Sequence, residues 1–149
     1  MLKLILAALL VVVVAGMGWV RLAPHDAARW HLDPRRVARP ASPNFFLLRM
    51  GDGDAPAPLF DMTPADLAER VHNVATAQGA KLLAGRVADG HMTYLSRSRL
   101  MGYPDYTTVL IEPAGDGAMM TAFARARFGY SDMGVNRARL EGWIAALTD

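Results

Sequence analysis

The chain begins with one unbroken apolar segment. Residues 4–20 carry no charge, Lys3 precedes them, and Trp19 and Arg21 stand at the far edge. As a helix, these 17 residues span about 25 Å, at the short end of the range for a hydrocarbon core. Trp and Arg are typical of the boundary between lipid and water. The pattern predicts an uncleaved transmembrane helix and membrane anchor over residues 1–21.

Two other interpretations of this segment stay open. A cleaved signal peptide also starts with a charged residue such as Lys3, although its apolar stretch is usually shorter and no Ala-x-Ala site follows here. A buried core helix has a similar composition.

The arginines that follow favour a cytoplasmic domain, whereas a translocation signal and the absence of cysteine suit an oxidising compartment. We expect a periplasm-like location.

The sequence predicts a connector over residues 22–41 and one folded domain over residues 42–149. Pro24, Pro34 and Pro40 keep the connector extended or turning, because proline breaks a long helix. The remainder of the chain is long enough for a single core and too short for two comfortable domains.

Two amphipathic helices are expected in the domain. Thr63 is a good N-cap, Pro64 suits the first helical position, and Gly79 ends the apolar repeat that follows. A second helix is expected to begin near Asp132 or Asn136. Its apolar stripe consists of Leu140, Trp143, Ile144 and Leu147.

Strand-like alternation fills the region between these helices, in residues 81–87, 91–99, 107–112 and 118–128. Asp89-Gly90 and the short segment 113–117 are typical hairpin connections, so consecutive strands should be antiparallel. The expected fold class is α+β: an antiparallel meander of about four strands, packed by two helices on one face and preceded by a transmembrane helix.

Charge and composition exclude several classes of function. Without Lys3 and Arg21, 14 basic residues face 14 acidic ones, so the domain lacks the strong positive charge of a nucleic-acid-binding protein. The absence of cysteine excludes disulfides, thiolate metal sites and cysteine nucleophiles. The histidines show no metal-ligand spacing. We therefore expect no nucleic acid, no metal and no cofactor.

Arginines collect at one predicted end of the sheet. Side chains alternate along a strand, so Arg97 and Arg99 share a face of the second strand, and Arg125 and Arg127 share a face of the last. In a meander these ends meet, with the two pairs about 10 Å apart across one intervening strand. Guanidinium groups bind carboxylates and phosphates through paired N–H groups.

Two uses of this cluster stay open. Asp105 and Asp132 emerge at the same end and could each pair with an arginine, which would hold the loops in place. Alternatively, the surplus positive charge forms a pocket for a phosphate, a carboxylate or a lipid headgroup, aided by the N-terminus of the last helix. The candidate ligand-binding residues are Arg97, Arg99, Arg125, Arg127, Asp105, Asp132, Asn136 and Arg137.

Two stretches carry a family resemblance. Residues 97–105 read Arg-Ser-Arg-Leu-Met-Gly-Tyr-Pro-Asp, residues 127–139 contain Gly-Tyr-Ser-Asp-Met-Gly-Val-Asn-Arg, and residues 42–44 read Ser-Pro-Asn. Over about residues 42–147 the chain resembles domain of unknown function family 1499. That family typically has cysteine where Phe45 stands and Arg-Ser-x-Ser-Arg where residues 123–127 read Phe-Ala-Arg-Ala-Arg. The resemblance implies a domain identity and no established activity.

We expect a membrane-anchored, non-catalytic binding module with an arginine-rich end that recognises an anionic small molecule or a lipid headgroup. A hydrolase or transferase that uses the same Arg/Asp cluster is the alternative from another class. It requires an activated nucleophile, and the chain keeps neither the cysteine nor the serines of the family pattern. A structural partner of another membrane protein is the third hypothesis.

Overall fold

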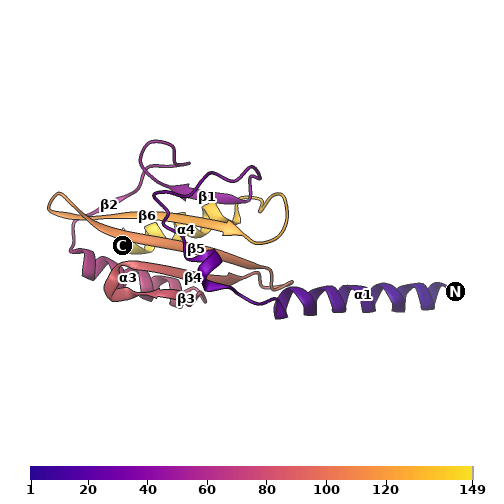
Figure 1. Cartoon of the computed structure of the whole chain (residues 1–149). Helices are drawn as coiled ribbons and strands as arrows, with labels where there is room; N and C mark the ends of the chain where they lie inside the picture. Colours follow the sequence, from indigo (N-terminus) through magenta and orange to yellow (C-terminus); the bar gives the residue numbers. More distant parts are fainter. Residues whose placement is uncertain (149) are drawn as a thin grey trace.

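The computed structural model describes residues 1–148 as a long N-terminal helix attached to a sheet domain with two helices (Figure 1). Asp149, the last residue of the predicted domain, lies outside the described residues. The helices are α1 (Leu2–Leu22), α2 (Ala27–Trp30), α3 (Pro64–Ala77) and α4 (Val135–Thr148), with a 3-10 turn η1 (Val87–Asp89). The strands are β1 (Phe45–Leu48), β2 (Leu59–Phe60), β3 (Lys81–Arg86), β4 (His91–Arg97), β5 (Pro104–Ala114) and β6 (Gly117–Ala126).

The sheet is antiparallel throughout, in the order β1-β6-β5-β4-β3, with β2 also paired to β6. The predicted α+β class and the meander from β3 to β6 are confirmed. The sheet has six strands rather than about four, because β1 and β2 add to the edge of β6. Each is too short to show the alternation that identifies a strand by itself: β2 has two residues.

The second predicted strand ends earlier than expected. Its hydrogen bonding to β5 stops at Arg97, where Ser98 starts a tight turn. The backbone N–H of Gly102 donates to the Ser98 carbonyl at 3.0 Å, and Gly102 has a φ of +73°, which glycine adopts without strain. Arg99 therefore lies in this turn and not on a strand face.

Helix α3 follows its sequence signals closely. The Thr63 hydroxyl accepts the backbone N–H of Asp66 at 3.1 Å, and Gly79 follows the helix with a φ of +83°. Both features match the expected N-cap and stop. In the apolar stripe of α3, Leu67 and Val71 are fully buried and Val74 is partly buried against the core.

The hydrophobic core lies between the sheet and the two helices α3 and α4, which both cover the same face (Figure 1). Its centre contains the ring of Trp143 from α4, edge-on to Tyr94 of β4 with 5.6 Å between ring centroids. Met92, Val109 and Met120 complete this face of the sheet.

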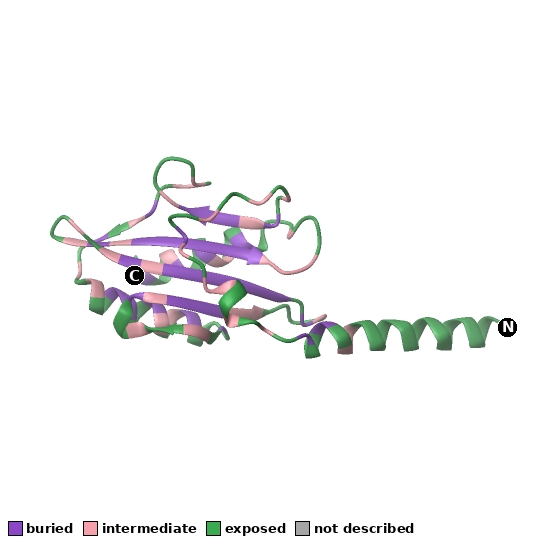
Figure 2. Cartoon of the chain, viewed as in Figure 1, coloured by how far each residue is buried: buried purple, intermediate pink, exposed green. Residues whose placement is uncertain are grey.

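The opposite face of the sheet is also buried, although no long helix covers it. Figure 2 shows β5 and β6 buried along most of their length and β4 buried in its middle. Thr93, Thr108 and Arg125 are all buried on this second face. The connector before β1, including the short helix α2, crosses the sheet there (Figure 1). A segment expected to be a linker thus forms the third layer of the domain.

We expect Leu67→Ala to lower the free energy of unfolding by about 2–5 kcal/mol, because it leaves a cavity under a fully buried helix face. Glu69→Ala on the exposed side of the same helix should change it by less than about 0.5 kcal/mol. Urea titration of the full chain in nonionic detergent, followed by tryptophan fluorescence, measures both. Equal midpoints for the two variants would contradict this packing.

Candidate functional site

The side chain of Arg125 lies at the centre of the connector-covered face. The residue is 4% exposed. Its Nη1 donates to Thr108 Oγ1 and to the Phe123 carbonyl, both at 2.9 Å, and its Nη2 donates to the Trp30 carbonyl. Burial lowers the pKa of Arg125 to about 10, so the group remains charged at neutral pH. No carboxylate among residues 1–148 pairs with it.

Trp30 attaches the connector to the sheet beside this guanidinium. Its ring stacks on Tyr106 of β5 with centroids 3.8 Å apart and planes 9° from parallel. Its carbonyl accepts from Arg125 and also from Thr108 Oγ1, at 3.1 Å. The Asp26 carboxylate accepts the backbone N–H of Ala28 at 3.0 Å and so starts α2. One turn of helix therefore places Trp30 over the sheet.

Arg97 and Arg127 bind the first part of the connector. Arg127 Nη1 donates to the Pro24 carbonyl at 2.8 Å, and Arg97 Nη2 donates to the Arg21 carbonyl at 3.1 Å. Arg97 Nη2 also lies 2.7 Å from His25 Nε2. A guanidinium can only donate, so Nε2 of His25 is the acceptor and the ring is neutral. Burial, followed by the charges of Arg97 and Arg127, lowers the pKa of His25.

A second histidine lies further along the connector. The ring of His31 stacks on His91 at a centroid distance of 3.9 Å, and its Nδ1 lies 2.9 Å from Thr93 Oγ1. Burial lowers the pKa of His31, and His91 and Arg125 lower it further. Both histidines are therefore built into the docked connector in their neutral forms.

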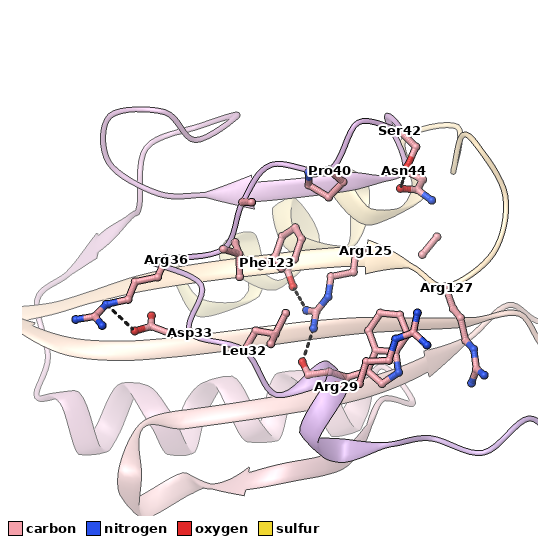
Figure 3. A pocket seen from close by; sticks show the side chains of 14 residues that line it. Arg29, Leu32, Asp33, Arg36, Pro40, Ser42, Asn44, Phe123, Arg125 and Arg127 are labelled. Atoms are coloured by element: carbon pink, nitrogen blue, oxygen red, sulfur yellow. Dashed lines mark hydrogen bonds and ion pairs between the residues drawn. The ribbon is translucent and has the colours of Figure 1, made fainter.

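A groove of about 680 Å³ opens between the connector and strand β6 (Figure 3). Arg125 points into it from β6, with Arg29 and Arg127 toward one end and Arg36 toward the other (Figure 3). The acidic residue in the lining is Asp33. Its pKa is lowered to about 2 by hydrogen bonding from Arg35, and the two side chains lie 2.7 Å apart.

The positive charge of the groove is therefore in excess. Asp33 is already paired with Arg35 and lies 3.8 Å from Arg36. Arg29, Arg125 and Arg127 have no carboxylate partner within the described part of the chain. The walls between them include Trp30 and Phe123, whose rings lie 5.4 and 4.5 Å from the Arg125 guanidinium. The groove can take a negatively charged group attached to an apolar or planar body.

Asp105, Asp132 and Asn136 form a different arrangement, on the helix-covered side of the sheet. Asp105 pairs with Arg139 at 2.9 Å, and Arg139 donates to Asn136 Oδ1 at 2.5 Å. Asn136 Nδ2 in turn donates to Asp132 Oδ2 at 2.7 Å and to the Asn44 carbonyl at 3.4 Å. Burial raises the pKa of Asp105, against the opposing effect of Arg139.

Asp132 has no arginine partner in the described residues and instead organises the start of α4. Its two carboxylate oxygens accept the backbone N–H groups of Gly134 at 3.1 Å and Asn136 at 2.9 Å. Asn44, from the Ser-Pro-Asn element, donates to the Gly129 carbonyl at 2.7 Å. This network holds β1, β5 and the loop before α4 together.

The eight sequence-predicted residues thus separate into groups. Arg97, Arg125 and Arg127 lie under the connector, at the predicted common end of the sheet. Asp105, Asp132 and Asn136 lie in the network on the other side. Arg99 is exposed in its turn, and Arg137 lies 3.8 Å from Glu141 with its guanidinium 4.7 Å from the Phe46 ring centre. Ligand binding by these residues stays a prediction.

Sequence reasoning missed Trp30, His25 and Arg29, which belong to the connector. Their signal in the sequence is weak, because it consists of the one tryptophan and two histidines (His25 and His31) of a proline-rich stretch. A second signal is the row of threonines opposite the core face, where Thr93 and Thr108 are buried. In residues 1–148, no three His, Cys, Asp or Glu side chains gather closely enough to hold a metal ion.

Residues 36–147 match the sequence model of a family described as "Protein of unknown function (DUF1499)". The match includes all the stretches on which the resemblance was based, and it reaches into the connector. It leaves out α1 and α2. None of the curated proteins matches the chain.

We expect Asp132→Ala to lower the free energy of unfolding by about 0.5–2 kcal/mol, the usual cost of losing a carboxylate that accepts first-turn N–H groups. Asp116→Ala, at the exposed β5–β6 hairpin, removes the same charge without these bonds and should have little effect. Urea midpoints of the full chain compare the two. Indistinguishable midpoints would contradict the assigned role of Asp132.

Docking of the connector should weaken in acid. The pKa values of His25 and His31 lie below their ordinary value of 6.5 when docked, so the undocked chain binds more protons below that pH. The contribution of the two neutral rings to docking is fully present above pH 6.5 and is lost as the pH falls through 6.5 toward the lowered values. Near-ultraviolet circular dichroism of the stacked Trp30 and Tyr106 reports it.

The matched variants are the double substitution His25→Gln with His31→Gln, and His72→Gln on α3 as the control. The double variant should lose most of the acid dependence, whereas the control should keep it. An unchanged acid transition in the double variant would mean that other groups cause it.

Proposed function

This chain belongs to the DUF1499 family of proteins of unknown function, and we propose that it is a membrane-anchored, non-catalytic module that binds an anionic group in the groove beside Arg125. Two features support this: the N-terminal helix and the unpaired charge in the groove. They are independent of each other.

The helix α1 supports the anchor. Its 21 residues, with a mean hydropathy of 2.4, are long and apolar enough to cross a membrane. Its leucine and valine side chains are largely exposed, and exposing so much apolar surface to water is unfavourable. Lipid around α1 removes that cost. A signal sequence has the same properties, so the size of the purified membrane protein distinguishes a retained helix from a cleaved one.

We place the domain on the periplasm-like side, because Lys3 followed by an apolar run is typical of a translocated protein. The chain has no cysteine, so a single cysteine introduced at Asp116 reports the side directly. It should react with a membrane-impermeant maleimide in intact cells. Labelling that occurs only after lysis would place the domain in the cytoplasm.

The observation that carries the binding proposal is the buried charge of Arg125. Burying an ionised group costs several kcal/mol unless an opposite charge accompanies it. Here three neutral oxygens and two ring faces are its partners. A bound anion would supply the missing negative charge, and Arg29 and Arg127 at the rim would add further donors.

The chemistry of the groove favours a phosphate or a carboxylate. Planar guanidinium groups donate paired N–H groups to both. The volume of about 680 Å³ is in the range of small-molecule sites, so it can hold more than the anionic group alone. A lipid headgroup and a soluble phosphate ester share this chemistry.

Inorganic phosphate is the first probe, titrated into the full chain in nonionic detergent at constant ionic strength. Binding to the folded state raises its stability by about 2.7 kcal/mol at one hundred times Kd, which appears as a higher Tm. The double variant Arg29→Gln with Arg127→Gln should lose most of this rise. Arg70→Gln, an exposed charge on α3, should keep it.

A third variant, Arg125→Met, removes the buried charge but retains much of its volume. Because the Arg125 guanidinium also holds the connector through the Trp30 carbonyl, near-ultraviolet circular dichroism of Trp30 and Tyr106 first checks that the connector is still docked. The docked Arg125→Met variant should no longer respond to phosphate. Glycerol phosphate and short-chain phosphatidylglycerol then distinguish a soluble ligand from a headgroup. No rise in Tm, or an equal rise in all variants, would overturn the proposal.

A further inference from the structure

The helix α1 leaves the domain at the end formed by two loops. One is the turn 98–103 between β4 and β5, and the other is the segment 127–134 between β6 and α4 (Figure 1). Arg21 Nη2 donates to the Leu100 carbonyl at 3.2 Å, and the ring of Trp19 lies 6.0 Å from that of Phe128. Both loops therefore lie level with the last turn of α1.

These loops expose large apolar side chains beside the helix. Leu100 is 79% exposed, Tyr130 is 75% exposed and Met133 is 94% exposed. None of the three contributes to the core. We call these residues, together with the half-exposed Tyr103 and Val135, the end surface. Its apolar groups, with tyrosines among them, have the composition of a protein surface at the boundary between water and lipid.

Positive charge accompanies the end surface. Arg21 and Arg99 are exposed there, and neither forms an ion pair with a carboxylate among the residues described. Asp132, the acidic residue of the two loops, is occupied by the backbone N–H groups of α4. The end surface is therefore apolar and cationic together, which suits an anionic lipid surface.

The length of α1 sets the level of the end surface relative to a bilayer. The 18 steps from Lys3 to Arg21 correspond to about 27 Å of helix, close to the thickness of a hydrocarbon core. Trp19 and Arg21 then lie at the lipid–water boundary. Because they contact the two loops, the loops are at headgroup depth.

We infer that the end surface rests in the headgroup layer of the membrane that holds α1, with Leu100, Tyr130 and Met133 inserted and anionic lipids bound to Arg21 and Arg99. This inference rests on the membrane anchoring proposed for α1. Strands β4 to β6 run in roughly the same direction as α1 (Figure 1), so the sheet stands upright on the membrane. The groove beside Arg125 then faces sideways, just above the lipid.

The cysteine-free chain allows a direct test with single nitroxide labels. Leu100→Cys and Met133→Cys report the end surface, Asp116→Cys at the β5–β6 hairpin is the control at the other end of the sheet, and Leu10→Cys reports the helix. The full chain is placed in nanodiscs of phosphatidylcholine, with and without phosphatidylglycerol. Power saturation with oxygen and with a water-soluble nickel complex measures the depth of each label.

We expect labels 100 and 133 to be more accessible to oxygen than to the nickel complex, and more strongly so with phosphatidylglycerol, while label 116 stays fully accessible to nickel. If label 10 is immersed but labels 100 and 133 behave like label 116, the inference is wrong and the anchor stands. If label 10 is also accessible to the nickel complex, both the inference and the proposed membrane anchor are wrong. Protection from both reagents, with dipolar coupling between labels, would indicate a second copy instead of lipid and would also overturn the inference.

Discussion

The structure depends on the hydrogen bond from the Arg125 guanidinium to the Trp30 carbonyl, which joins the connector to the sheet. Without the connector, the face that contains Thr93, Thr108 and Arg125 would be open to water. The connector buries this polar face. The charged guanidinium of Arg125 is buried with it, and its hydrogen-bond acceptors are one hydroxyl and two carbonyl oxygens, all neutral. Since α1 leads directly into the connector, this contact also ties the orientation of the sheet to the helix. The same contact therefore controls the groove and the position of the end surface.

Local signals predicted the larger elements of the fold. Thr63, Pro64 and Gly79 define α3 because capping and φ preferences act within a few residues, and alternation with hairpin residues defines β3 to β6. Strands β1 and β2 were not found because they exist through pairing with β6, which lies more than 50 residues further along the chain. A two- or four-residue strand has no period of its own. The third layer was missed for the same reason, since Trp30 and Tyr106 meet across a long stretch of sequence.

For the site, side-chain alternation predicted correctly that Arg125 and Arg127 share a face of their strand, and the meander predicted correctly that Arg97 lies at the same end of the sheet. It also placed Asp105 at that end, but the same period of two puts Asp105 on the other face, with Val109 and the core. The end of the sheet at which a residue lies therefore does not determine which face of the sheet its side chain occupies. Arg99 was misplaced for another reason. It lies in the turn stabilised by Gly102, beyond the end of the strand, so the alternation of side chains does not apply to it.

The two polar clusters differ in charge balance, and this difference distinguishes the candidate site. In the network of Asp105, Arg139, Asn136 and Asp132, each charge meets an opposite charge or several donors, and the Asn44 carbonyl closes the set. Such a network fixes the β6–α4 loop. In the groove, three guanidinium groups lack a counter-charge within the described residues. A buried charge without a counter-charge is costly, so the open groove beside Arg125 is the better candidate for a ligand site. The motif residues Asp132 and Asn136 instead hold the domain together.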